Sequence, residues 1–191
     1  AVGSVPGFEG SGCVVGGSGL LARLFLGRRV AFASSESGGS WAEFSTAQVM
    51  KCVPLRSGVS DLEGATVLTN PMTATALLER AKAEGHRTVV QAAAAGALGT
   101  MMARLAPRLG LTMIHLVRDA SQVAHLAGQG AQHIVDTSEP GYEEELASLT
   151  QKFNATLALD PVGGPLTGVL VRALRDRGVV RIYGWLSGQP A

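Results

Sequence analysis

The sequence has few cysteines and little charge, and each shortage excludes a class of protein. Its 191 residues include two cysteines, Cys13 and Cys52. Two are too few for a disulfide framework or a zinc site with four cysteine ligands. Charged residues make up 16%, and 16 Lys and Arg against 15 Asp and Glu give a formal net charge of +1. Because a dedicated nucleic-acid surface needs a basic excess, we expect no nucleic-acid partner.

Long apolar runs are also missing. The longest uncharged apolar stretch, residues 92–103, is shorter than the roughly 20 residues of a membrane-spanning helix. The first ten residues show no basic segment followed by an apolar run, so no signal peptide is visible. We therefore expect a soluble cytoplasmic protein without a membrane partner.

Small and apolar residues are abundant. Hydrophobic residues make up 46% and there are 25 glycines, a composition that predicts a folded chain rather than a disordered one. Up to residue 58, short apolar runs alternate with Gly and Ser clusters, which is typical of short strands joined by tight turns. The expected strands are residues 13–15, 30–33, 41–44 and 49–53.

The pattern changes at Ser60, where residues 60–63 have the form of a capping box. Helices and strands then alternate, which predicts βαβ units and a doubly wound parallel sheet, an α/β fold. The expected helices are 72–82 (with Pro71 at the first helical position), 97–106, 120–127, 142–152 and 166–174. The expected strands are 88–91, 111–117, 133–135, 156–160 and 179–183.

A small-residue turn joins the first of these strands to its helix. A dinucleotide pyrophosphate binds backbone N–H groups at a helix N-terminus where no side chain intrudes. Gly96 would let the backbone approach the phosphates, and Gly99 would let the helix pack closely on the strand. Ala94 stands where the usual pattern has its first glycine. The strand and helix around the turn favour a dinucleotide site over an Ala-rich turn that merely packs well.

The next strand is followed by Arg118 and Asp119, which favour different cofactors. NAD enzymes place an acid about 20 residues after the glycines to bind the ribose hydroxyls, and Asp119 fits that spacing. Arg118, however, is the first polar side chain beyond the strand, and a guanidinium can pair with the 2′-phosphate of NADP. Asp119 also suits the N-cap of the next helix, with Gln122 at its third position. We therefore favour NADPH; the alternative for Arg118 is an ordinary solvated surface arginine.

Several segments occur together in an order that resembles a known family. They are VPGFEGSG at 5–12, GRRVAF at 27–32, GSWAEF at 39–44, NPMTA at 70–74, the Ala-rich loop with Gly96 and Gly99, and LDPVGG at 159–164. Together they resemble the medium-chain dehydrogenase/reductase superfamily, and most closely its zinc-free, quinone-oxidoreductase-like branch. Residues 70–74 and 117–119 also resemble the enoyl thioester reductases of that branch. The resemblance covers residues 5 to about 184, nearly the whole chain.

The resemblance implies a fold and a chemistry. Residues 1–68 would be part of a β-rich, GroES-like catalytic domain, and residues 69–191 a Rossmann cofactor-binding domain that is incomplete at its C-terminal end. The implied reaction is NADPH-dependent hydride transfer to a small electrophilic substrate: a quinone, an enone or an enoyl thioester. With Arg118, the cofactor-binding residues would be Thr73, Ala94, Gly96, Ala97, Leu98, Val162, Gly163, Tyr183 and Gly184.

The chain departs from the zinc alcohol dehydrogenases of the superfamily. They carry a ligating His just before the Glu that matches Glu9, whereas this chain has Phe8 there. Residues 31–40 also contain none of the cysteines of their zinc lobe. We therefore expect no metal site.

Sequence alone assigns no catalytic residue. Tyr183 is a candidate proton donor, although packing or a cofactor contact is the more common role for such a residue. Asp160, at a strand end, is expected to brace the following turn. His115 and His133 are expected within strands, and His86 and His125 in solvent.

The resemblance also raises an expectation about completeness. Compared with the family, the chain begins within the catalytic domain and stops after the fifth Rossmann strand. We therefore expect weak NADPH binding, poor turnover and an uncovered sheet edge after residues 179–183, which favours association into a homodimer. The alternatives are a catalytically incomplete NADPH-binding fragment or sensor and a Rossmann methyltransferase; the GroES-like motifs argue against the methyltransferase.

Overall fold

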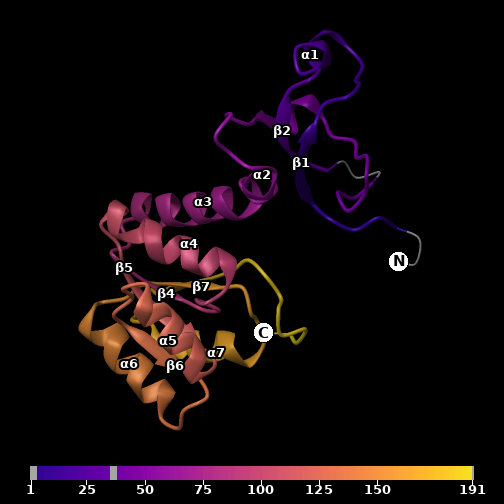
Figure 1. Cartoon of the computed structure of the whole chain (residues 1–191). Coiled ribbons are helices and arrows are strands. Elements are labelled where there is room, and N and C mark those ends of the chain that lie inside the picture. Colours follow the sequence, from indigo (N-terminus) through magenta and orange to yellow (C-terminus); the bar gives the residue numbers. More distant parts are fainter. Residues whose placement is uncertain (1–3, 35–37, 191) are drawn as a thin grey trace. The chain divides into compact units, whose positions relative to one another are not determined.

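The computed structural model describes residues 4–34 and 38–190, and the chain divides into two compact units, Ala1–Met72 and Thr73–Ala191 (Figure 1). In the described part of the first unit, three strands form an antiparallel sheet in the order β1-β2-β3. Its elements are β1 (Glu9–Cys13), α1 (Leu20–Arg23), β2 (Arg29–Ala33), a 3-10 helix (Val49–Lys51), β3 (Cys52–Pro54) and α2 (Asp61–Gly64).

The first unit corrects three of the expected strands, those at 13–15, 41–44 and 49–53. In the last of these, residues 49–51 form a 3-10 helix and β3 begins at Cys52. Residues 41–44 form bends rather than a strand, and both aromatic side chains there, Trp41 and Phe44, are exposed. The strand expected over 13–15 overlaps β1 at Cys13 alone, because the register of β1 with β2 runs from Glu9 opposite Ala33 to Cys13 opposite Arg29. Short runs of this kind contain too few residues for alternation to separate a strand from a bend.

The predicted capping box is confirmed at the start of α2. The Ser60 hydroxyl accepts a hydrogen bond from the Glu63 amide, and the Glu63 carboxylate accepts one from the Ser60 amide at 2.8 Å. These hydrogen bonds lower the pKa of Glu63. The two groups therefore satisfy amides that would otherwise lack partners at this helix end.

The second unit contains the predicted doubly wound sheet. In the described residues, five parallel strands lie in the order β6-β5-β4-β7-β8. They are β4 (Thr88–Gln91), β5 (Thr112–Val117), β6 (Ile134–Asp136), β7 (Leu157–Asp160) and β8 (Val179–Ile182). The helices are α3 (Thr69–Ala83), which starts within the first unit, α4 (Ala97–Leu105), α5 (Ala120–Gly128), α6 (Tyr142–Lys152) and α7 (Pro165–Ala173).

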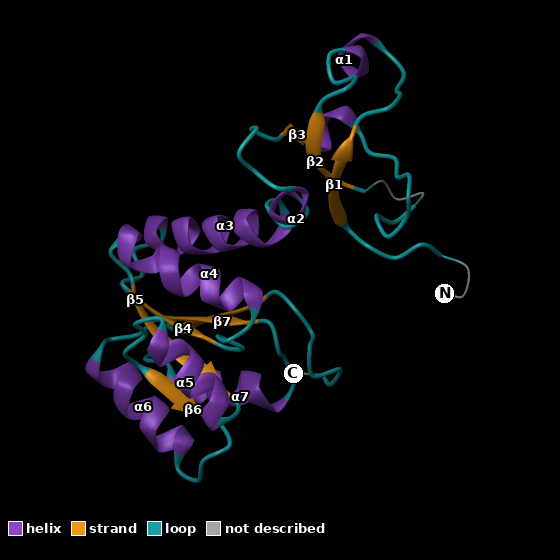
Figure 2. Ribbon diagram, viewed as in Figure 1, coloured by secondary structure: helices purple, strands orange, loops and turns teal. Residues whose placement is uncertain are grey.

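Helices cover the sheet in two layers (Figure 2). Side chains of α3 and α4 pack with Val89 and Leu157 on one face, whereas those of α6 and α7 pack with Val90 and Ala158 on the other. The strand order reverses between β4 and β7, so the carboxyl ends of these strands form the switch point where ligands of such sheets bind. Within the described residues, no helix has both the length and the apolar character needed to cross a membrane.

Two prolines lie where helix geometry changes. Pro107 follows the end of α4 at Leu105 and belongs to a 3-10 helix (Ala106–Leu109), so the regular helix ends before this proline. Pro71 is not at the first helical position, because α3 begins two residues earlier, at Thr69. Both positions avoid the interior turns in which proline removes a hydrogen bond.

Gly99 fixes how closely α4 approaches the turn before it. A Cβ built on Gly99 would overlap the Ala94 carbonyl oxygen and lie 2.7 Å from Gln91 Nε2. Real side chains do not tolerate such contacts with backbone, so only glycine fits without a shift of the helix. The predicted close packing of helix on strand is therefore confirmed.

We predict that Gly99→Ala destabilises the protein by about 1–3 kcal/mol, because the added methyl overpacks the turn. The matched control is Gly128→Ala at the end of α5, where a Cβ would meet no atom within 4 Å. Urea denaturation should show a lower midpoint for the first variant and no loss for the second. Equal stability of the two variants would contradict the steric role of Gly99.

Candidate functional site

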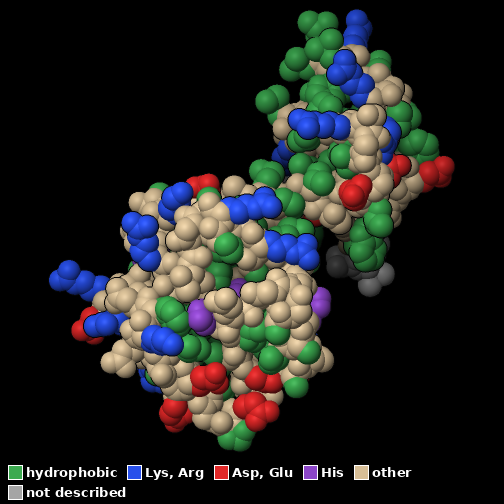
Figure 3. Space-filling model, turned by 60° about the vertical axis from the view of Figure 1, so that its left-hand side comes forward, with side chains coloured by type: hydrophobic (Ala, Val, Ile, Leu, Met, Phe, Trp, Pro, Cys, Tyr) green, Lys and Arg blue, Asp and Glu red, His purple; other side chains and the backbone are tan. Residues whose placement is uncertain are grey.

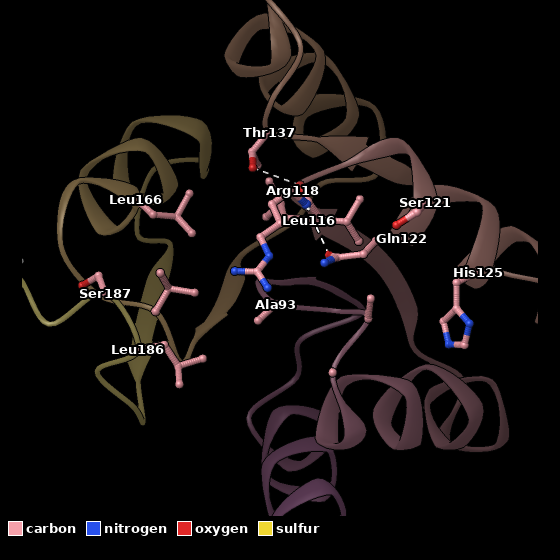
Figure 4. Close-up of a pocket in the computed structure, with 14 residues that line it drawn as sticks. Ala93, Leu116, Arg118, Ser121, Gln122, His125, Thr137, Leu166, Leu186 and Ser187 are labelled. Carbon is pink, nitrogen blue, oxygen red and sulfur yellow. Dashed lines mark hydrogen bonds between the residues drawn. The ribbon is translucent and has the colours of Figure 1, made fainter.

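A cleft of about 970 Å³ lies at the carboxyl ends of the strands in the second unit (Figure 4). Its wall combines the turn after β4, the junction of β5 and α5, the residue that follows β6, the turn after β7 and the segment after β8. The cleft therefore occupies the switch point of the sheet, where the sequence predicts a dinucleotide.

The turn after β4 offers backbone rather than side chains to this cleft. Gly96 is the N-cap of α4, and no side chain caps this helix end. A Cβ on Gly96 would meet only the Ala93 carbonyl oxygen, at 3.4 Å, so packing within the protein does not require glycine here. The space that a side chain would occupy belongs to the cleft, as expected if a ligand approaches the backbone.

The conformation of the turn is held by the strands beside it. Ala93 has a left-handed backbone with φ of 50°. On either side, the Ala92 amide donates to Leu159 of β7 and the Ala94 amide to Leu116 of β5, at 3.0 and 3.1 Å. Ala94 itself is fully buried, so its side chain packs inside the protein and does not face the cleft.

Arg118 and Asp119 have separate roles at the next strand end. Asp119 Oδ1 accepts hydrogen bonds from Ser121 Oγ at 2.5 Å and from the Gln122 amide at 2.9 Å. These bonds lower the pKa of Asp119 and make it the N-cap of α5, as predicted. Arg118 is exposed and lines the cleft, and Figure 4 shows its side chain extending into the open space. In the described residues its guanidinium forms no hydrogen bond or ion pair.

The turn after β7 is organised by a buried carboxylate. Asp160 is fully buried; its Oδ1 accepts from the Val162 and Gly163 amides at 2.8 and 2.9 Å, and its Oδ2 accepts from Thr167 Oγ1 at 2.6 Å. The expectation that Asp160 braces the following turn is therefore confirmed. Because Val162 lines the cleft, this carboxylate positions part of the cleft wall.

The segment after β8 lies along the turn after β7. The Leu186 and Ser187 amides donate to Pro161 and Val162, at 3.1 and 2.9 Å. Gly184 permits this approach, since a Cβ there would lie 2.6 Å from the Pro161 carbonyl oxygen. The braced turn therefore carries a second strand-end segment, whose residues Leu186 and Ser187 line the cleft.

Tyr183 has a partly buried side chain that packs against the apolar cluster under α3 and α4. Burial, together with the nearby charge of Asp160, raises its pKa to about 12. The phenol is therefore protonated at neutral pH, but it is a weak acid.

The ten predicted binding residues fall into three groups. Gly96, Arg118 and Val162 line the cleft. Neighbouring positions in the same strand-end turns, or at the start of α4, are taken by Ala94, Ala97, Leu98, Gly163 and Gly184. Tyr183 contacts the apolar cluster, and Thr73 lies on α3; neither lines the cleft.

Sequence reasoning missed several cleft residues. Ser121 and His125 lie on α5 beside Arg118, and Thr137 follows β6 and donates from Oγ1 to the Val117 carbonyl oxygen at 2.9 Å. A polar residue directly after a parallel strand is the signal that could have found Thr137. Leu186 has no such signal, because only the fold of the last segment brings it here.

The histidines differ in part from expectation. His86 is not solvated: it is half-buried, with Nδ1 2.8 Å from Thr156 Oγ1. His133 lies just before β6 rather than within a strand, whereas His115 lies within β5 and is buried. His125 is exposed, as expected. Among the residues described, no group of three or more His, Cys, Asp or Glu side chains could hold a metal ion.

We predict that Thr167→Val destabilises the protein by about 1–3 kcal/mol, because a buried carboxylate oxygen loses its hydroxyl donor. Thr167→Ser keeps the donor and is the matched control. Thermal unfolding at neutral pH should rank Ser close to the parent and Val clearly below it. A Val variant as stable as the Ser variant would show that Asp160 does not depend on this hydrogen bond.

Comparisons with known proteins agree on one family. A family model described as zinc-binding dehydrogenase matches residues 97–191. The mitochondrial enoyl-acyl-carrier-protein reductase of Xenopus tropicalis is 31% identical over 158 residues, which cover 80% of this chain and 45% of that protein.

Solved structures share the fold. A candidate NADPH:quinone reductase from Mesorhizobium loti superposes with a TM-score of 0.91 and 36% identity, covering 96% of this chain and 54% of that chain. A mycobacterial protein solved in complex with NADPH gives a TM-score of 0.82 and 27% identity, covering 97% and 58%. The chain thus spans about half the length of the relatives it matches.

Proposed function

The chain belongs to the medium-chain dehydrogenase/reductase superfamily, and from that premise we propose that it binds NADPH for hydride transfer to a small electrophilic acceptor. The observation that carries the proposal is that one cleft combines a helix N-terminus without a side-chain cap and Arg118, whose guanidinium has no hydrogen bond or ion pair with the described residues. Two relatives support it by their names, one an enoyl reductase and the other a candidate NADPH:quinone reductase.

A dinucleotide fits the residues that are present. The pyrophosphate would bind the first amides of α4, at Ala97 and Leu98, with Gly96 leaving room for its approach. Helix N-termini favour such anions because unpaired N–H groups and the helix dipole both point at the ligand. Val162, held by Asp160, would line the opposite side.

We favour NADPH over NADH because Arg118 and Asp119 have different roles at the end of β5. Asp119 Oδ1 accepts two hydrogen bonds at the start of α5, which hold the carboxylate at that helix end as its N-cap. Arg118 offers its guanidinium to the cleft, and such a planar fork of donors suits a phosphate monoester. We therefore assign the 2′-phosphate to Arg118.

When bound, NADPH supplies the hydride, and the residues of this chain bind and orient it. Proposed acceptors are quinones, enones and enoyl thioesters. After hydride transfer, enones and enoyl thioesters need a proton at the carbon next to the carbonyl, whereas a quinone needs a proton on oxygen. Zinc-independent reduction is part of the proposal; it rests on Phe8 at the position of a ligating His and on the lack of a metal-binding cluster among the described residues.

The second candidate function is NADPH binding without turnover. It is favoured by Tyr183, whose pKa of about 12 and contacts with the apolar cluster make it a poor proton donor. A dinucleotide sensor would need the binding half of the site but no donor. The two candidates share every prediction about binding and differ only in turnover.

We predict that Arg118→Ala weakens NADPH binding by about 1.5–3 kcal/mol, the value of a hydrogen bond to a charged group, and leaves NADH binding nearly unchanged. Arg175→Ala removes an equally exposed arginine between α7 and β8 and is the control. Calorimetric titrations with both cofactors measure the effect. Equal losses for NADPH and NADH would refute the phosphate role.

Turnover distinguishes the two candidates. NADPH oxidation should be followed with a simple quinone and with a short enoyl thioester, for this chain and for any longer gene product that contains it. Reduction that depends on NADPH and falls in Arg118→Ala supports the reductase. Tight NADPH binding without reduction of either acceptor supports the sensor, and absence of NADPH binding by a folded product refutes both.

A further inference from the structure

A second cavity, of about 780 Å³, lies between the C-terminal ends of α4 and α5. Its walls come from α4 and the 3-10 helix after it, from the end of α5 and the connection to β6, and from β5 beneath them. None of its lining residues lines the dinucleotide cleft. It is therefore a separate site with its own chemistry.

Buried apolar side chains form a large part of the inner surface of this cavity, and the imidazoles of His115 and His133 also line it. Leu111, Met113 and Leu126 are buried and line it, and the Phe153 ring closes one side, with its centroid 4.3 Å from that of His133. A ligand that fills the cavity would thus place an apolar body against these side chains.

His115 is the polar lining residue that is most deeply buried. His115 is 4% exposed, and its Nδ1 is buried without a hydrogen-bond partner in the described part of the protein. Burial and the neighbouring His133 lower its pKa to about 4, so the ring is neutral at pH 7 and can donate at one nitrogen and accept at the other. A buried nitrogen without a partner is uncommon in proteins, and a hydrogen bond from a ligand or a bound water would stabilise it.

The rim of the cavity is cationic. Arg104 and Arg108 line it from α4 and the 3-10 helix, and no Asp or Glu is among its lining residues. Arg104 donates to Gln129 Oε1 across the opening at 3.2 Å, whereas the Arg108 guanidinium has no hydrogen bond or ion pair with any described residue. Figure 3, turned to bring the left-hand side of Figure 1 forward, shows Lys and Arg at several places on the second unit and Asp and Glu nearer its lower end.

Arginines near helix ends have an ordinary explanation, because cations there complement the helix dipole. That explanation accounts for the positions of Arg104 and Arg108 on the last turns of their helices. It does not account for an apolar cavity beneath them or for the unpaired nitrogen of His115. The three features together describe a site for a molecule with an apolar body and an anionic group.

We propose that this cavity binds a small aromatic or branched carboxylate. The apolar body contacts Met113, Leu126 and Phe153, the carboxylate pairs with Arg108 and Arg104 at the rim, and a polar atom of the ligand or of a water bound with it satisfies His115. Carboxylates pair well with guanidinium groups because two N–H donors can meet two oxygens. The site does not depend on the proposed cofactor.

The test uses 2-naphthoate as the probe and 2-naphthalenemethanol as its neutral counterpart, with the 191-residue chain. Calorimetry and amide NMR shifts should show one saturable site for 2-naphthoate, with shifts at the cavity residues and binding unchanged by saturating NADPH. The imidazole ¹⁵N resonances of His115 should move, whereas those of the exposed His125 should not.

Charge is tested with matched double variants. Arg104→Gln with Arg108→Gln should weaken 2-naphthoate binding by at least about tenfold, the effect of losing hydrogen bonds to a charged group. Arg175→Gln with Arg177→Gln removes the same charge from exposed positions before β8 and should change binding by less than about twofold. The alcohol should bind more weakly than the carboxylate.

Three results would overturn the proposal: no saturable binding of 2-naphthoate, equal weakening by both double variants, or displacement by NADPH. Because the probe is titrated with and without cofactor, failure of NADPH binding would leave this measurement intact. The two proposals therefore fail separately.

Discussion

The approach of α4 to the turn before it is the constraint on which the site depends. With no side chain at Gly99, the helix begins directly above Ala94, and its first amides face the carboxyl ends of the strands. A wider approach would move those amides away from β5 and β7, where the other walls of the cleft begin. The absence of a methyl group at one position thus sets the geometry of the cleft, whose other walls come from several strand ends.

Two carboxylates fix the backbone of two other parts of the cleft wall. Asp119 caps α5 and Asp160 braces the turn after β7, and each does so with backbone amides as donors. Both are therefore engaged in structure, which leaves the exposed Arg118 as the charged strand-end group offered to the cleft. The proposed binding of an anion in the cleft rests on the positions of these acids as much as on the position of the arginine.

The second unit was largely predictable from sequence, and the first was less so. Parallel strands such as β4 and β7 are short apolar runs followed at once by turn residues, and each helix has a recognisable start, such as Asp119 with Gln122. In the first unit, Trp41 and Phe44 suggested a strand, but their pattern carries no information on whether a partner strand lies beside them. Likewise, the burial of His86 beside Thr156 depends on contacts between residues 70 positions apart, which no local pattern encodes.

The left-handed backbone of Ala93 has a consequence for the thermodynamics of ligand binding. The left-handed conformation is unfavourable for an alanine by roughly 1–2 kcal/mol. A glycine would adopt it without that cost but would also sample other backbone conformations. The hydrogen bonds of Ala92 and Ala94 to the adjacent strands maintain it in the free protein. The conformational entropy of this turn is therefore lost during folding, so a ligand that binds here meets a preorganised loop and pays little to order it.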